Sequence, residues 1–145
     1  MSETTLHVII VIILIFHGVG HLMGVITAVG MFSAARSSGR GWLRNWSSES
    51  WLLTDLLGET AARITCAIIY IAAFVCFISA SLGLAGWLVP YLCWRALAVS
   101  GAVISLFGIA LYWNALILFF PHKVGAILVN AAVLVCSIWK DLVKV

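Results

Sequence analysis

The chain is organised as four long apolar runs separated by shorter, more polar segments. The runs cover about residues 6–28, 61–84, 90–118 and 124–141. Each can supply the roughly 20 apolar residues that a helix needs to cross about 30 Å of hydrocarbon. None alternates in polarity as the strands of a membrane barrel do, and unpaired backbone is too costly in lipid. The pattern predicts an all-α integral membrane four-helix bundle, a single transmembrane domain over residues 1–145.

Composition strengthens the membrane assignment. Hydrophobic residues make up 64% of the chain and charged residues 9%, whereas a soluble domain carries about 25% charged residues. So much apolar surface also excludes a disordered chain. The formal net charge is +3, and no basic block indicates nucleic-acid binding. The lipid bilayer is therefore the partner that composition predicts.

The positive charges predict an orientation. Arg36, Arg40 and Arg44 lie in the segment 29–60 between the first two runs, whereas the other side has Lys140 and Lys144 near the C-terminus and Arg95 slightly inside the third run. Cytoplasmic loops carry the excess of Lys and Arg. We expect segment 29–60 to be cytoplasmic and both termini to lie outside.

The same segment contains apolar residues at helical spacings. They fit a helix lying in the membrane interface with its aromatic rings toward the lipid, or equally a loop packed on the end of the bundle. The residues are Trp42, Leu43, Trp46, Leu53 and Leu57.

The strongest local signal is a pair of histidines in the first run. His17 and His21 are four residues apart, so they share a helical face. Neutral imidazole binds transition metals, serves as an axial ligand to haem or another tetrapyrrole, and relays protons. The equally weighted alternative is that each histidine hydrogen-bonds to a neighbouring helix and fixes its packing. Gly20 and Gly24 form a small-xxx-small pair that predicts a close approach by another helix or a flat ligand.

Three further polar residues complete the candidate site. Glu59 pairs with Arg63 at the cytoplasmic mouth, or joins the histidines as a third ligand or proton acceptor. Asn114 and Asn130 are predicted as supporting residues, with Asn130 about 10 Å deeper by helical rise. The predicted cofactor-binding residues are thus His17, His21, Glu59, Asn114 and Asn130, and the predicted metal ligands are His17 and His21.

Two motifs carry a resemblance to a known group. They are Phe-His-Gly-Val-Gly-His-Leu-Met-Gly at 16–24, and Pro-His-Lys-Val-Gly-Ala at 121–126 followed by Asn130. With four spans in 145 residues, the chain resembles small prokaryotic membrane proteins loosely related to the DoxX-like group. The resemblance implies a four-span fold in the inner membrane. Some members of that group are linked to quinone-coupled sulfur oxidation, but none of their catalytic residues aligns here.

These observations predict a small accessory or cofactor- or lipid-binding membrane subunit. We expect it to form a homo-oligomer or to associate with a larger membrane complex. One alternative is a membrane oxidoreductase that uses a metal, haem or quinone bound by His17 and His21. A second is a small oligomeric transporter, which would need a polar path across the whole membrane.

Overall fold

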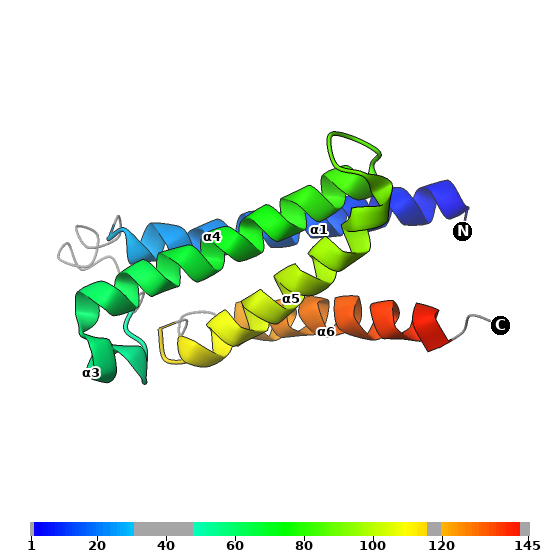
Figure 1. Ribbon diagram of the computed structural model, residues 1–145. Helices are drawn as coiled ribbons and strands as arrows, with labels where there is room; N and C mark the ends of the chain where they lie inside the picture. Colours follow the sequence, from blue (N-terminus) through cyan, green and yellow to red (C-terminus); the bar gives the residue numbers. More distant parts are fainter. Residues whose placement is uncertain (1, 31–47, 116–119, 143–145) are drawn as a thin grey trace.

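The computed structural model describes residues 2–30, 48–115 and 120–142, and within these ranges it contains helices and no strand. This confirms the predicted all-α class. The elements are α1 (Glu3–Ala28), α3 (Leu53–Leu57), α4 (Glu59–Leu84), the short 3-10 helix η2 (Tyr91–Cys93), α5 (Trp94–Leu111) and α6 (Phe120–Leu142) (Figure 1).

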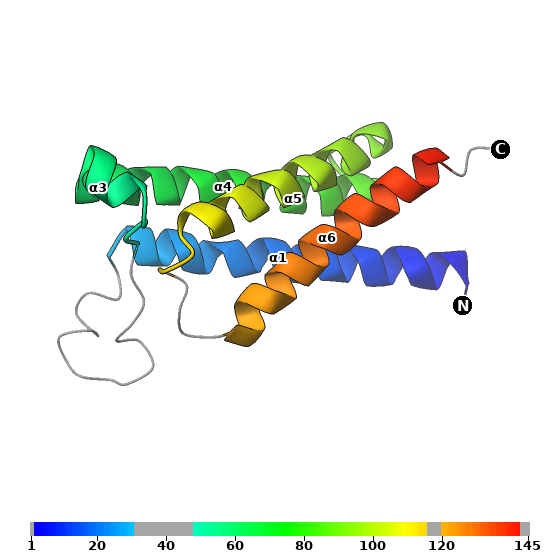
Figure 2. The same ribbon diagram turned by 90° about the horizontal axis from the view of Figure 1, so that it is seen from below.

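The four long helices form an up-and-down bundle. Helices α1 and α4 lie side by side along their length, α5 folds back along α4, and α6 packs on α5 while crossing α1 (Figures 1 and 2). The N-terminal end of α1 and the C-terminal end of α6 lie at the same end of the bundle, and α3 lies at the other. Four alternating passes require this arrangement of the termini.

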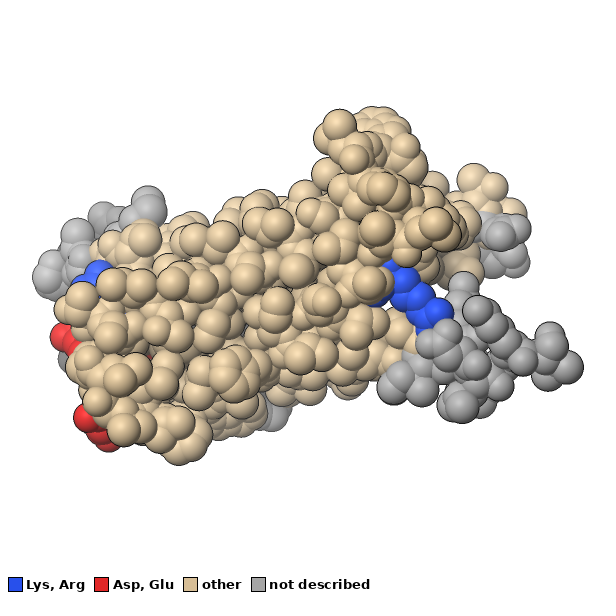
Figure 3. Space-filling model, viewed as in Figure 1, with Lys and Arg blue, Asp and Glu red and all other residues tan. Residues whose placement is uncertain are grey.

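Among the described residues, three helices are long and apolar enough to cross a membrane, namely Thr4–Ala28, Glu59–Leu84 and Tyr91–Leu111. Helix α6 has 23 residues, about 35 Å at the usual helical rise. The part of α6 whose side chains are described, Lys123–Ser137, is an apolar helix. Figure 3 shows that the face viewed there has Lys, Arg, Asp and Glu only toward its two ends, with an uncharged belt between them.

Two boundaries differ from those expected. Helix α5 ends at Leu111, and residues 112–115 form a turn, whereas the third run was predicted to continue to 118. Residues 116–118 lie outside the described ranges. Pro121 lies in the first turn of α6 rather than before it, where the missing proline N–H costs nothing.

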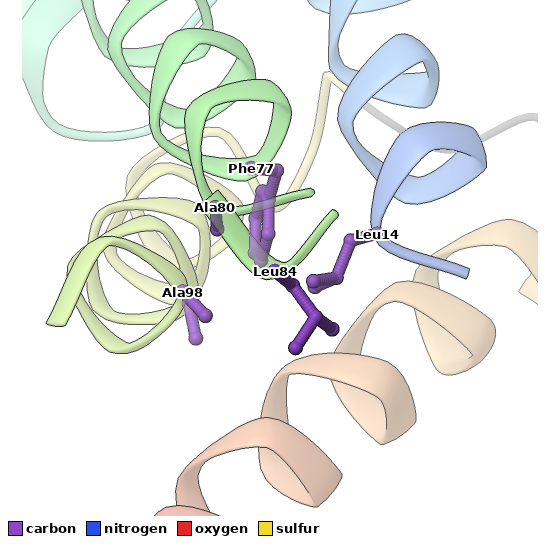
Figure 4. Packing of buried hydrophobic residues seen from close by; sticks show 6 residues of the cluster. Leu14, Phe77, Ala80, Leu84 and Ala98 are labelled. Carbon is purple, nitrogen blue, oxygen red and sulfur yellow. The ribbon is translucent and has the colours of Figure 1, made fainter. Parts of the chain in front are cut away.

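The core is built from two apolar clusters stacked along the bundle. The first lies toward the end that carries the termini and joins α1, α4 and α5 (Figure 4). It consists of Leu14, Phe77, Ala80, Leu84, Ala98 and Ala102. The second lies toward α3 and consists of Ala28, Cys66, Tyr70, Tyr112 and Ala115.

Glycines set the spacing between α1 and α4. A Cβ on Gly24 would lie 2.5 Å from the Tyr70 ring, and one on Gly18 would lie 3.1 Å from the Cβ of Phe77. A Cβ on Gly20 would meet nothing within 4 Å. Among the described residues, the close approach between helices therefore uses Gly18 and Gly24 and not Gly20. The predicted approach of a flat ligand at Gly20 stays a prediction.

The described part of the first connection packs on the end of the bundle. The Ser50 hydroxyl donates to the Leu111 carbonyl at 2.6 Å, and the Trp51 indole donates to that of Ala110 at 2.8 Å. These bonds satisfy carbonyl groups that the end of α5 leaves without helical partners. Within residues 48–58, only the five residues of α3 are helical, so this part of the connection packs as predicted for a loop on the end of the bundle. Trp42, Leu43 and Trp46 lie outside the described residues.

Candidate functional site

A chain of hydrogen bonds joins three helices near the middle of the bundle. His17 Nε2 lies 2.9 Å from Asn130 Oδ1, and Asn130 Nδ2 donates to Ser105 Oγ at 2.7 Å. Asn130 and Ser105 are completely buried. Because Oδ1 is an acceptor only, His17 donates its Nε2 proton to it. Asn130 thus links α6 to both α1 and α5.

His21 lies one helical turn from His17, closer to the α3 end, and inserts between two aromatic rings of α4. Its ring centroid lies 5.8 Å from that of Tyr70 and 5.6 Å from that of Phe77, with interplanar angles of 27° and 18°. Tyr70 and Phe77 are about 10 Å apart by helical rise, so the imidazole lies between them. The His17 ring meets those of His21 and Phe77 edge to face.

Two buried polar atoms among these packed rings lack a hydrogen bond. Within the part of the chain that the structure describes, His21 Nε2 and the Tyr70 hydroxyl have no partner. The His21 side chain is 6% exposed and that of Tyr70 is 3% exposed. Most buried polar atoms in proteins are paired, and an unpaired one costs about 1–3 kcal/mol. This position in the bundle therefore has unused hydrogen-bonding capacity.

Tyr112, a buried tyrosine next to Tyr70, does have a hydrogen-bond partner. Tyr112 belongs to the same apolar cluster as Tyr70, and their ring centroids are 6.4 Å apart. The Tyr112 hydroxyl donates to the Ala62 carbonyl at 2.6 Å. The lack of a partner therefore distinguishes Tyr70 from an equally buried phenol beside it.

Two predicted site residues, Glu59 and Asn114, lie away from His17, His21 and Tyr70. Glu59 is 69% exposed, and its Oε1 lies 3.9 Å from Nη1 of Arg63. It therefore pairs with Arg63, which is the first of the two predicted alternatives. It is the first residue of α4, about 16 Å by helical rise from Tyr70. Arg63 also donates through Nε to the Ala28 carbonyl at the end of α1. Asn114 is exposed in the turn after α5.

The residues present fit a small hydrogen-bonding group better than a metal ion or a tetrapyrrole. A closed zinc site takes four ligands, and the described residues contain no group of three or more His, Cys, Asp or Glu side chains placed to hold a metal. His17 Nε2 is already engaged by Asn130. Aromatic rings flank the His21 imidazole, so a macrocycle bound to it would have to displace them.

Sequence reasoning missed Tyr70 and Ser105 as members of the site. Tyr70 lies four residues after Cys66 on the face of α4 that packs against α1, and Ser105 lies among small residues that indicate close packing. The available signal was a hydroxyl in the interior of an apolar run, which needs a partner inside the bundle. That signal also applies to many purely structural hydroxyls.

In comparisons with protein-family models, curated proteins and solved structures, nothing matches this chain. The DoxX-like resemblance therefore stays a prediction. The structure itself defines a small helical bundle with apolar, membrane-length helices and a polar cluster near its middle.

Proposed function

We propose that this chain is a small integral membrane subunit that binds a neutral, oxygen-bearing, lipid-soluble ligand inside its helix bundle. The observation that carries the proposal is the pair of buried, unpartnered polar groups on His21 and Tyr70. A ligand oxygen that hydrogen-bonds to both would satisfy them. His17, Asn130 and Ser105 would support the site by holding α1 against α5 and α6.

The ligand is expected to be neutral because no opposite charge is available at this depth. The chain has no Asp, Glu, Lys or Arg in residues 4–28, 64–84, 96–111 or 124–139. A buried unpaired charge is far costlier than a buried neutral group. A quinone meets this requirement because its carbonyl oxygens accept hydrogen bonds without carrying charge. Among the predicted cofactors, the site therefore favours a quinone, and the oxidoreductase alternative is retained in that form.

A transport function is less well supported. The half of the bundle that carries the termini is filled by the apolar cluster around Leu14, Phe77 and Leu84. A transported solute would need polar partners there. We retain the small oligomeric transporter only as the lowest-ranked alternative.

The proposed setting is a prokaryotic inner membrane with the α3 end in the cytoplasm. Arg63 and Lys123 lie at this end, together with the arginines predicted for the first connection, as the positive-inside rule requires. The apolar outer face of α1, including Phe16 and Ile12, suits lipid or a neighbouring subunit of a homo-oligomer or larger complex.

The test is to purify the full chain gently from its native membrane and identify co-purifying small molecules by solvent extraction and mass spectrometry. Short-chain benzoquinone and naphthoquinone binding is then measured by calorimetry in nanodiscs. Tyr70→Phe should weaken binding about 5- to 10-fold, the value of one hydrogen bond. His21→Phe should weaken it at least as much. Tyr112→Phe is the matched control and should leave the affinity within about 2-fold, since its hydroxyl already donates to Ala62 and offers the ligand no donor.

The stability of the ligand-free protein is a second readout, independent of ligand binding. In ligand-free protein, Tyr70→Phe should raise the free energy of unfolding, because it removes an unpaired buried hydroxyl. An unchanged ligand content in both Tyr70→Phe and His21→Phe would overturn the proposal. So would a Soret-like absorption band or a stoichiometric metal in the same sample, which would return the histidines to the role of cofactor ligands.

A further inference from the structure

The connection between α4 and α5 presents an uncharged apolar tip. Residues 85–93 run Ala-Gly-Trp-Leu-Val-Pro-Tyr-Leu-Cys, and the nearest charged residues along the chain are Arg63 and Arg95. Leu88 is 94% exposed and Leu92 is 92% exposed. Trp87 and Tyr91 are also exposed.

The backbone fixes this tip in an uncommon shape. Helix α4 ends in a Schellman motif, in which Trp87 N donates to the Leu82 carbonyl and Gly86 N to that of Gly83, with Gly86 at φ 72°. Val89 N then donates to the Trp87 carbonyl, closing a three-residue turn around Leu88. Leu88 has φ 55°, the only positive φ of a non-glycine residue in the described ranges. That conformation is disfavoured for a leucine and persists only where the surroundings compensate for it.

The tip is continuous with the lipid-facing surface. Figure 1 shows the connection folding out to the side of the bundle at the end of α4, and Figure 3 shows no Lys, Arg, Asp or Glu on the visible face of that lobe. The exposed apolar side chains of α4 and α5, such as Val75 and Val103, lead up to it. A tip at the end of two membrane-length helices lies at the depth where Trp and Tyr rings prefer to sit.

We infer that residues 87–92 insert sideways into the headgroup–acyl boundary of the bilayer and anchor the terminus-bearing end of the bundle there. Lipid is the favoured occupant, rather than a second copy of the chain, because the tip carries no charged residue and exposed apolar side chains lie on both helices that lead to it. In water the same tip would combine a disfavoured backbone with two almost fully exposed leucines. Insertion removes the leucines from water, and the amphipathic rings of Trp87 and Tyr91 suit the boundary itself.

The experiment places a fluorescent amino acid at Leu88, Leu92 or Ser2 by stop-codon suppression in the otherwise unchanged full chain. Ser2 is exposed at the end of the bundle that carries the tip and is the water-facing control. Leu92 lies in η2 with ordinary backbone, so it reports even if a bulky probe disturbs the turn at Leu88. Each protein is reconstituted in phosphatidylcholine vesicles brominated at a shallow acyl position, and quenching is compared with that by aqueous iodide.

We expect bromolipid quenching at positions 88 and 92 to be at least 2-fold that at position 2, and iodide quenching to be at least 3-fold lower. With the probe at position 92, Leu88→Asn should reduce bromolipid quenching, because asparagine tolerates positive φ but lacks the apolar side chain. Iodide access equal to that at Ser2 would overturn the inference. Shielding from both quenchers that disappears as the protein is diluted with lipid would also overturn it, in favour of a second copy covering the tip.

Discussion

Asn130 of α6 accepts a hydrogen bond from His17 of α1 across 113 residues of sequence, and its amide group donates to Ser105 of α5. One carboxamide thus joins three helices, and α6 otherwise packs mainly on α5. Hydrogen bonds between membrane helices average about 0.6 kcal/mol and reach about 1.7. The polar link therefore makes a modest energetic contribution while fixing the register of α6.

Replacing Asn130 should loosen α6. We expect Asn130→Leu to lower the free energy of unfolding in mixed micelles by about 1–2 kcal/mol, because it leaves both His17 and Ser105 without their partner. A double-mutant cycle with Ser105→Ala should give a coupling of about 0.5–1.5 kcal/mol. Leu128→Ala, on the exposed side of α6, is the control and should cost less. Equal losses in Asn130→Leu and Leu128→Ala would mean that the link does not stabilise α6.

The two glycines of the histidine motif should respond oppositely to alanine. Gly24→Ala would place a methyl group 2.5 Å from the Tyr70 ring, and overpacking of this kind costs about 1–3 kcal/mol. Gly20→Ala meets open space and should be neutral or slightly stabilising, since alanine favours helix by up to about 1 kcal/mol. The measurement is unfolding of both variants in the same detergent. Similar losses of unfolding free energy in Gly24→Ala and Gly20→Ala would contradict this register of α1 on α4.

Tyr112 should be needed for its hydroxyl group. Tyr112→Phe removes the bond to the Ala62 carbonyl, and we expect it to lower the free energy of unfolding by about 0.5–1.5 kcal/mol. Tyr91→Phe, at an exposed tyrosine, should change stability by less than about 0.5 kcal/mol. A Tyr112→Phe protein as stable as the parent chain would show that the bond contributes nothing.

Arg63 should matter through its bond to the backbone rather than through its ion pair. Arg63→Met removes the donor to the Ala28 carbonyl and should cost about 1–2 kcal/mol, because a bond from a charged donor is stronger than a neutral one. Glu59→Gln breaks only an exposed pair at 3.9 Å and should cost less than about 0.5 kcal/mol. The loss in Arg63→Met should persist at high salt. A larger loss of unfolding free energy in Glu59→Gln than in Arg63→Met would show that the ion pair, and not the bond to the backbone, is the main contribution of Arg63.

Much of the fold was predictable because membrane helices are specified by local composition. A run of about 20 apolar residues must form a helix in lipid, since no other structure satisfies its backbone. The four runs and the shared face of His17 and His21 follow from this rule and from helical periodicity. The end of α5 was harder to predict because residues 112–115 are apolar enough to continue a helix, yet form a turn in which Tyr112 reaches Ala62.

The sequence by itself determined that the chain forms apolar helices of membrane length, and that two imidazoles and an asparagine lie inside them. Only the tertiary structure decided which polar groups meet. The packing of Gly18 on Phe77 and of Gly24 on Tyr70 sets the register of α1 against α4, which places His21 beside Tyr70 and leaves Glu59 at the bundle end. The crossing of α6 over α1 brings Asn130 to His17. Helical periodicity fixes the angle of a residue on its own helix, whereas depth and rotation relative to another helix depend on how the side chains of both pack together.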